Sequence, residues 1–160
     1  MIEGDVFAIA KVLQEGKQVH HDSPAVGVAW VKALRAKLNR PGTGRLYTTL
    51  FFTDAAGKVH PYGKRSPHRA SAPGEPPAKD SGNLRDSTYA KPKRVPDGAE
   101  VEAGSKSQVA AWQEYGTQKI FPRPWFRPTL NEVKDKLFKI WTDGIVRRER
   151  AKARSLGGRG

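Results

Sequence analysis

Hydrophobic residues recur at helical spacing in three parts of the chain. Apolar positions 2, 6, 9, 10, 12 and 13 predict a helix over residues 2–19. A second stripe predicts a helix over 24–39 and contains Val28, Val31, Leu34, Ala36 and Leu38, with Trp30 beside it. A third stripe predicts a C-terminal helix to about residue 154 and contains Leu130, Val133, Leu137, Ile140 and Trp141.

Other segments have the composition of strands. The run LYTTLFFT at 46–53 is rich in β-branched and aromatic residues, and a turn at 54–57 leads to a returning strand at 58–62. We expect further strands at 85–91 and at 99–103, the latter on Val101 alone, with a basic turn at 92–98 between them. Because strands do not alternate regularly with helices, the pattern predicts an α+β fold, with a small antiparallel sheet packed with N-terminal and C-terminal helices.

Residues 63–80 have no periodicity. The segment is polar and rich in proline, and it is long for a loop in a domain of this size. We therefore predict a long irregular loop that becomes ordered only against another surface.

A short helix is predicted just before the C-terminal one. Ser105 with Gln108 fits a capping box ahead of an apolar run, and Gly116 stands where a left-handed residue would end that helix. Thr129 with Glu132 fits a second capping box, at the start of the C-terminal helix.

Three prolines stiffen the segment between these two helices. Pro122, Pro124 and Pro128 each fix their own φ and move the preceding residue out of the helical region. Residues 119–127 are therefore predicted to form an extended arm, anchored by its three aromatic residues, Phe121, Trp125 and Phe126.

Composition indicates one basic domain. The 160 residues carry 29 basic and 16 acidic side chains, a net charge of +13, which favours a polyanionic neighbour. We expect a single domain over 1–146 and a basic tail over 147–160. The chain has no cysteine, no apolar run long enough to span a membrane, and a start, MIEGD, unlike a signal peptide.

Candidate chemistry is sparse. His68, Ser71 and Asp80 could be combined as a hydrolase triad, but no nucleophile elbow surrounds Ser71, so a solvated loop is the better interpretation. His20 and His21 are adjacent and diverge in a regular element, which argues against a shared metal. The sequence predicts a protein that is not an enzyme and uses no cofactor or metal.

Two charged features leave alternatives open. Glu114 is interpreted as a surface or interface carboxylate that pairs with an arginine of the arm. The tail could bind phosphate nonspecifically or be a solvated helix end favoured by the helix dipole, and it contains Arg147, Arg148, Arg150, Lys152 and Arg154.

Three segments, in order, resemble a known family. HRASAPGEPPAKDSGNLRDS (68–87), WQEYGT (112–117) and FPRPWFRPTL (121–130) are similar to motifs of phage head–tail connection proteins, the neck or tail-completion family typified by the tenth gene product of HK-type siphophages. The resemblance covers roughly half the chain, residues 68–145.

The resemblance implies a structural virion protein, located at the neck and assembled in the host cytoplasm. Copies of the chain would form a ring around the DNA channel, with a hexamer preferred over a dodecamer. Its partners would be head-closure or adaptor proteins, a tail terminator or tail tube protein, and packaged DNA nearby, but no membrane. The competing class is a free-standing basic nucleic-acid-binding protein.

Closure of a ring requires two different patches that meet between neighbouring copies. We expect the 63–80 loop and the 119–127 arm to form them. The candidate interface residues are Trp112, Glu114, Tyr115, Phe121, Arg123, Trp125, Phe126, Arg127, His68 and Arg69. The basic residues of the tail are expected to face DNA or an acidic partner.

Overall fold

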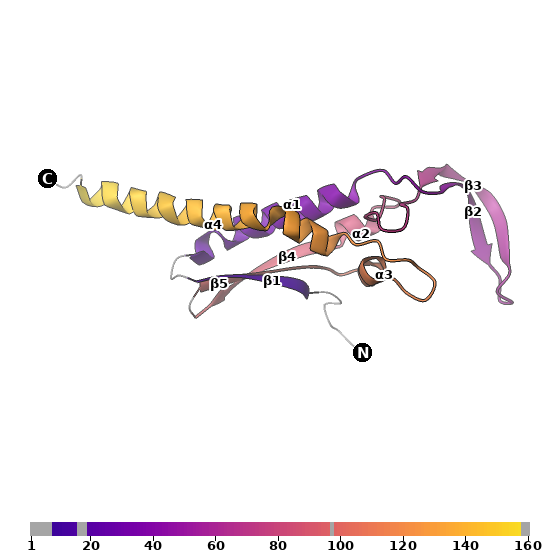
Figure 1. The fold of residues 1–160 in the computed structure, drawn as a ribbon, viewed down its shortest axis with the longest axis horizontal. Helices are drawn as coiled ribbons and strands as arrows, with labels where there is room; N and C mark the ends of the chain where they lie inside the picture. The colour runs from indigo at the N-terminus through magenta and orange to yellow at the C-terminus, as the bar shows by residue number, and fades with distance from the viewer. Residues whose placement is uncertain (1–7, 16–18, 97, 158–160) are drawn as a thin grey trace.

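Two long helices lie over a three-stranded sheet, and a separate hairpin projects from one end (Figure 1). The computed structural model describes residues 8–15, 19–96 and 98–157. In chain order the elements are β1 (Ala8–Glu15), the 3-10 turn η1 (Val19–His21), α1 (Ser23–Leu38), β2 (Leu46–Thr53), β3 (Val59–Arg69), α2 (Asn83–Asp86), β4 (Thr88–Val95), β5 (Gly98–Ser105), α3 (Val109–Tyr115) and α4 (Phe126–Gly157). This arrangement confirms the predicted α+β class.

The sheet of the body has the order β1-β5-β4, and all its pairs are antiparallel. Alternate residues of β5, Ala99, Val101 and Ala103, are fully buried on the face that α1 and α4 cover. On the opposite face, β4 and β5 carry Lys91 in register with Glu102. The sheet is therefore apolar on its helix-covered face and charged on the other.

Three tryptophans and a phenylalanine fill the layer between the helices and the sheet. Trp30 from α1, Phe126 and Trp141 from α4, and Trp125 just before α4 all have no exposed surface. The Trp30 and Phe126 rings lie 5.8 Å apart, so α1 packs directly on the first turn of α4. The rest of the core consists of Val26, Leu34, Leu38, Ala99, Val101, Ala103, Ala110 and Leu137.

The predicted helix over 2–19 is wrong where the structure describes it. Residues 8–15 form strand β1, which pairs with β5 from Ala8↔Gly104 to Glu15↔Gly98. The rest of that prediction, apart from Val19 in η1, lies outside the described residues. The pairing partner is about ninety residues away in the sequence, so local periodicity carried no sign of it.

Other boundaries also move. Strand β3 continues to Arg69, so the irregular loop begins at Ala70 and not at 63. The segment 85–91 is divided between α2 and β4, and β4 extends through Pro92 to Val95, where a turn was expected. Pro92 has no N–H to donate, and a position on an edge strand tolerates this.

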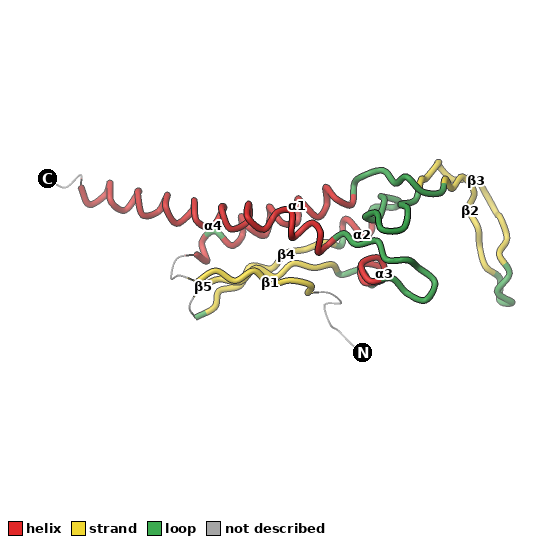
Figure 2. The backbone as a smooth tube through the Cα atoms, viewed as in Figure 1, coloured by secondary structure: helices red, strands yellow, loops and turns green. Residues whose placement is uncertain are grey.

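Two elements reach beyond the body. The β2–β3 hairpin projects from one end, and the C-terminal half of α4 projects from the other (Figures 1 and 2). Helix α4 is 32 residues long and continues past the expected end near residue 154 to Gly157. The proposed boundary between residues 146 and 147 therefore falls inside one continuous helix.

Candidate subunit interface

Glu114 is the structural centre of the arm region. It is only 5 % exposed, and its carboxylate accepts the backbone N–H groups of Trp125 (2.8 Å), Phe126 (2.9 Å) and Arg127 (3.1 Å). These are N–H groups that the first turn of a helix leaves without intrahelical partners. A carboxylate at that place also complements the positive end of the helix dipole. Glu114 in α3 therefore caps α4, and the predicted surface ion pair is wrong.

The two predicted capping boxes are also wrong. Thr129 is inside α4, and its hydroxyl donates to the carbonyl of Trp125 at 2.6 Å. Ser105 is the last residue of β5, and its hydroxyl pairs with that of Ser87 at 2.7 Å. The sequence pattern looked for each capping residue within a few positions of its own helix. Helix α4 is instead capped by Glu114, which belongs to α3.

Trp125 and Phe126 do not form an exposed arm. Both side chains are fully buried in the chain's own core, and their rings meet edge to face at 5.6 Å. Helix α4 begins at Phe126, so the extended segment ends at Trp125, two residues earlier than the predicted 119–127 arm. Because neither ring reaches the surface, we withdraw Trp125 and Phe126, together with Glu114, as interface residues.

The other aromatic residues of the region stay on the surface. Trp112 is 41 % exposed, Tyr115 47 % and Phe121 73 %. The guanidinium of Arg127 lies over the Tyr115 ring, 5.2 Å from its centroid. This set, which we call the aromatic surface, comprises Trp112, Tyr115, Phe121 and Arg127.

Gly116 determines where α3 ends and the arm turns. Its φ is +77°, which favours glycine as expected, but its ψ of −179° differs from the left-handed helical conformation that was predicted, and its N–H donates to the carbonyl of Trp112 at 3.0 Å. A Cβ at this position would lie 2.7 Å from the carbonyl oxygen of Ile120. Only glycine fits here, so the arm folds back tightly along α3.

Arg123 is a link inside the chain. Its backbone N–H donates to the carbonyl of Gln113 at 2.6 Å, and its Nε donates to the carbonyl of Ser71 at 3.3 Å. The carbonyl of Pro122 accepts from the N–H of Gly74 at 3.1 Å. The arm therefore lies against α3 on one side and against the proline-rich loop on the other.

Glu75 organises the proline-rich loop. Its carboxylate accepts the hydroxyl of Thr43 at 2.5 Å and the N–H groups of Thr43 (3.2 Å) and Ala72 (2.9 Å). The hydroxyl of Thr43, followed by the N–H of Ala72, keeps the pKa of Glu75 below its ordinary value. The loop is therefore ordered by contacts within the chain, contrary to the expectation that it requires another surface.

The three residues considered as a triad line one cavity of about 470 Å³. The Nδ1 of His68 lies 3.8 Å from Oδ1 of Asp80, which is too long for a hydrogen bond. Ser71 is buried and contributes its backbone carbonyl to Arg123. The geometry does not contain the hydrogen-bonded base and orienting acid that a triad requires.

Arg69 and His68 end strand β3 at this cavity. Arg69 is exposed, and its Nη1 donates to the carbonyl of Gly44 at 3.0 Å. His68 is half-buried and lines the cavity wall. Both residues therefore lie where the hairpin joins the body.

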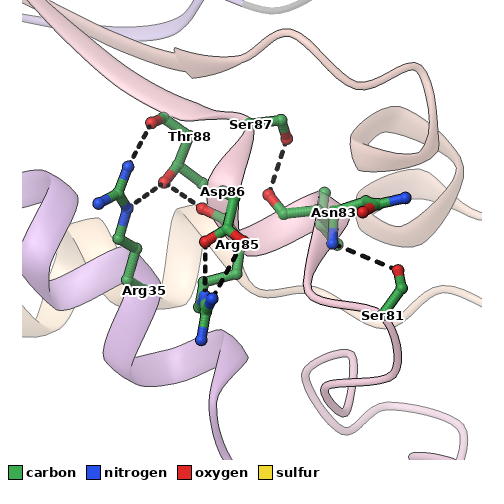
Figure 3. A network of polar contacts seen from close by, with 8 residues as sticks. Arg35, Ser81, Asn83, Arg85, Asp86, Ser87 and Thr88 are labelled. Carbon is green, nitrogen blue, oxygen red and sulfur yellow. Dashed lines mark hydrogen bonds and ion pairs between the residues drawn. The ribbon is translucent and has the colours of Figure 1, made fainter.

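A polar network connects α1 to the other end of the proline-rich loop (Figure 3). Arg35 in α1 donates to both the hydroxyl (3.2 Å) and the carbonyl (3.4 Å) of Thr88. Arg85 pairs with Asp86 at 2.7 Å, which lowers the pKa of Asp86 and raises that of Arg85. The hydroxyl of Thr88 also donates to the carbonyl of Arg85 at 2.7 Å, so Thr88 links the end of the segment SGNLRDS to α1.

The hairpin exposes the largest group of apolar side chains away from the body. The exposed residues are Leu46, Tyr47, Phe51, Phe52, Val59 and Tyr62. Phe52 stacks on His60 at 5.1 Å, and Nε2 of His60 lies 2.8 Å from the carboxylate of Asp54 in the turn. Sequence reasoning identified these strands but did not identify their surface as a candidate site, because a strand of this composition is usually buried.

The basic residues of the tail divide between two faces of α4. Arg148 pairs with Asp22 at 2.5 Å, so it faces the body and stabilises the contact between α1 and α4. Arg147, Arg150 and Arg154 line one hollow on the projecting part of the helix, as residues three and four positions apart do. Lys152 is exposed.

Within the described residues, no group of three or more metal-ligating side chains comes together, and the rings of His20 and His21 lie 4.0 Å apart at a tilt of 36°. None of the described helices combines the length and apolar character needed to cross a membrane.

Comparison of the chain with protein-family models, curated proteins and solved structures gave no match.

Proposed function

We propose that the chain is a structural subunit of a tailed bacteriophage virion, a neck or tail-completion protein that forms a ring between the DNA-filled head and the tail. The ring would surround the DNA channel, with a hexamer preferred, and would contact head-closure or adaptor proteins on one side and tail proteins on the other. The chain would have no catalytic role.

The observation that carries this proposal is the exposure of large apolar side chains, both on the projecting hairpin and on the outer surface of α3 and the arm. The hairpin exposes six such residues, and the aromatic surface adds three aromatic rings. Monomeric proteins rarely expose contiguous apolar patches beyond a few hundred Å². A two-stranded hairpin is also only marginally stable alone, so partners that cover it would stabilise it.

The resemblance of three segments to the connector family supports the same proposal. Two of these segments hold the subunit together, through Glu75 in the loop and Glu114 in WQEYGT. The third supplies both the buried pair Trp125–Phe126 and the exposed Phe121. The motifs therefore have a definite physical task in this fold, which is to dock the loop, α3 and the arm around the start of α4.

The test is genetic and structural, in the phage that encodes the chain. Deletion of its gene is expected to yield DNA-filled heads and complete tails that do not join, and expression from a plasmid is expected to restore joined particles. Mass spectrometry of purified virions should detect the chain. Joined, infectious virions that lack it would disprove the proposal.

A second candidate function is free-standing nucleic-acid binding. It is favoured by Arg147, Arg150 and Arg154, which share one face of the projecting part of α4. This alternative predicts that the isolated protein binds DNA with an affinity that falls steeply as salt rises, because bound counterions are released on association. Weak binding with a shallow salt slope would argue against it.

A further inference from the structure

The β2–β3 hairpin has a surface that needs a partner. Its six exposed apolar side chains are about half exposed each, which leaves on the order of 500 Å² of apolar surface in contact with water. That area approaches the roughly 800 Å² that one partner contributes to a standard protein interface. Phe51 and Phe52 are consecutive in β2 and therefore point to opposite faces of the ribbon. A flat surface would cover only one of them, whereas a groove encloses both.

The same chain carries a suitable groove. A hollow of about 620 Å³ lies between α1 and β4, and its wall includes Val28, Val31, Ala90 and Pro92. Val28 is 70 % exposed, although it lies in an otherwise well-packed helix. In the part of the chain that the structure describes, β4 pairs only with β5, so the outer edge of β4 borders this groove without a neighbouring strand. An added ribbon could therefore contact both apolar side chains and a free strand edge.

We propose that the hairpin of one copy occupies the α1–β4 groove of a second copy. This rests on the proposed function, because it specifies the contact by which the subunits of a ring would join. The hairpin projects from one end of the molecule, beyond the body that contains the groove (Figure 1). It therefore does not fill the groove of its own chain. The contact joins two different patches, which is the kind that generates a ring or a filament.

Charge supports a second copy as the occupant. The hairpin turn presents Asp54, whose pKa is lowered by the hydrogen bond from His60 and by the N–H of Lys58, so it stays ionised. The described lining of the groove contains no acidic residue but includes Lys32 and Arg35. The turn also contains Lys58 and has no net negative charge, but the Asp54 carboxylate offers an ion-pair partner to Lys32 or Arg35 at the rim.

The charge distribution also disfavours nucleic acid as the partner of the hairpin. Between residues 50 and 62 the only lysine or arginine is Lys58, while Arg45, Lys64 and Arg69 lie near the base of the ribbon. Phosphate contacts require basic side chains beside the stacking rings. The outer half of the hairpin is instead apolar, which suits a protein groove.

The sign of the salt effect distinguishes the two partners. Each copy carries a net charge of +13, so copies repel one another and added salt screens that repulsion. Self-association through an apolar hairpin should therefore strengthen between about 50 mM and about 0.5 M salt. Binding to DNA should weaken over the same range.

Two charge substitutions in the full-length chain test the contact. Phe51→Asp places a charge on the hairpin, and Val28→Asp places one in the groove. Leu156→Asp is the control, because Leu156 is 69 % exposed on the projecting part of α4, close to the 70 % of Val28. Analytical ultracentrifugation is expected to show at least a tenfold weaker self-association for each of the first two variants and wild-type behaviour for the control. Circular dichroism checks that each variant folds.

Mixing the two variants gives the sharper result. Phe51→Asp retains an intact groove and Val28→Asp an intact hairpin, so the mixture contains one functional contact and should stop at a dimer. A cross-linking experiment tests the same contact with cysteine variants, because the chain has no cysteine of its own. Val28→Cys places a thiol in the groove and Val59→Cys places one on the hairpin. A short bis-maleimide should join these two variants into a dimer when they are mixed, and should not cross-link either variant alone.

Two results would overturn this inference. One is a Val28→Asp variant that assembles like the wild type, as hairpin-to-hairpin pairing predicts. The other is a wild-type chain that stays monomeric at high salt. Rings that persist in both Asp variants would refute the hairpin contact but leave the structural role intact, whereas absence of the chain from virions would refute the role and not the contact.

Discussion

Gly144 of α4 lies directly against the carboxylate of Asp22, at the start of α1. A Cβ built on Gly144 would be 2.2 Å from Cγ of Asp22, a distance that real atoms do not reach. Glycine inside a helix costs about 1 kcal/mol relative to alanine. The close approach of the two helices explains its presence here, and the neighbouring ion pair between Asp22 and Arg148 needs that approach.

We therefore predict that Gly144→Ala destabilises the protein although alanine is the better helix former. Overpacking typically costs about 1–3 kcal/mol, which exceeds the gain in helix propensity. The measurement is the free energy of unfolding in urea. In a double-mutant cycle, Asp22→Ala should relieve most of the loss, and additive effects of the two substitutions would contradict the proposed clash.

Removal of the α4 cap should have a larger effect than its single carboxylate suggests. Glu114→Ala leaves three backbone N–H groups without their acceptor, two of which belong to the buried residues Trp125 and Phe126. We expect a loss of about 2–4 kcal/mol in the free energy of unfolding. Glu149→Ala, at an exposed position of the same helix, should change it by less than about 0.5 kcal/mol.

The buried and exposed aromatic residues of FPRPWFRPTL should behave oppositely. Trp125→Ala is expected to destabilise the fold by about 3–5 kcal/mol, because it empties a fully buried site. Phe121→Ala should leave the melting temperature nearly unchanged, since Phe121 is 73 % exposed. If the aromatic surface takes part in assembly, Phe121→Ala alone should weaken it. Equal thermal stability of the two variants would contradict the burial described above.

Glu75 predicts an acid-sensitive loop. Because its folded pKa is lowered from the ordinary value of 4.5, the carboxylate stabilises the loop fully above that pH. This contribution is lost as the pH falls through the lowered folded pKa. The amide NMR signals of Thr43 and Ala72 should shift with a midpoint below 4.5. In Glu75→Gln they should not titrate there, and a midpoint above 4.5 would contradict the hydrogen bonds.

The arginine face of α4 gives a prediction for DNA. The triple variant Arg147→Ala, Arg150→Ala, Arg154→Ala should weaken nonspecific DNA binding and reduce the salt slope by up to about 0.9 for each lost phosphate contact. Arg148→Ala should act mainly on stability, because Arg148 pairs with Asp22. Fluorescence anisotropy at several salt concentrations measures both the affinity and the slope.

Helices α1, α3 and α4 and the hairpin could be predicted because their patterns are local. Helix α1 was found within a residue of its bounds, although its buried stripe is Val26, Trp30, Leu34 and Leu38, and Val28 faces outward. The spacing of apolar residues showed a helix, but not which of two neighbouring stripes packs on the sheet. The packed face is the one that contains Gly27, where a Cβ would lie only 3.3 Å from Cβ of Ala90 in β4.

The strand predicted at 99–103 on Val101 alone is confirmed as β5 (Gly98–Ser105), but neither its central place in the sheet nor the cap of α4 could be found in this way. Strand β5 has one large apolar residue, yet Ala99 and Ala103 are fully buried, because small side chains let the helices approach the middle of the sheet. The sequence suggested that Glu114 is a surface carboxylate, because no residue of its own helix indicates that α4 begins beside it. Both features depend on contacts between elements, which a local pattern does not contain.

The length of α4 has a consequence for whatever its end touches. Each residue adds about 1.5 Å and turns the helix by about 100°, so Gly157 lies on the order of 14 Å beyond Arg148, which pairs with Asp22 of the body. Deleting one residue between them would shorten the reach only slightly. It would, however, rotate Arg154 by more than a quarter of a turn about the helix axis. Any function that depends on the direction in which the Arg154 side chain points is therefore more sensitive to this rotation than to the length of the helix.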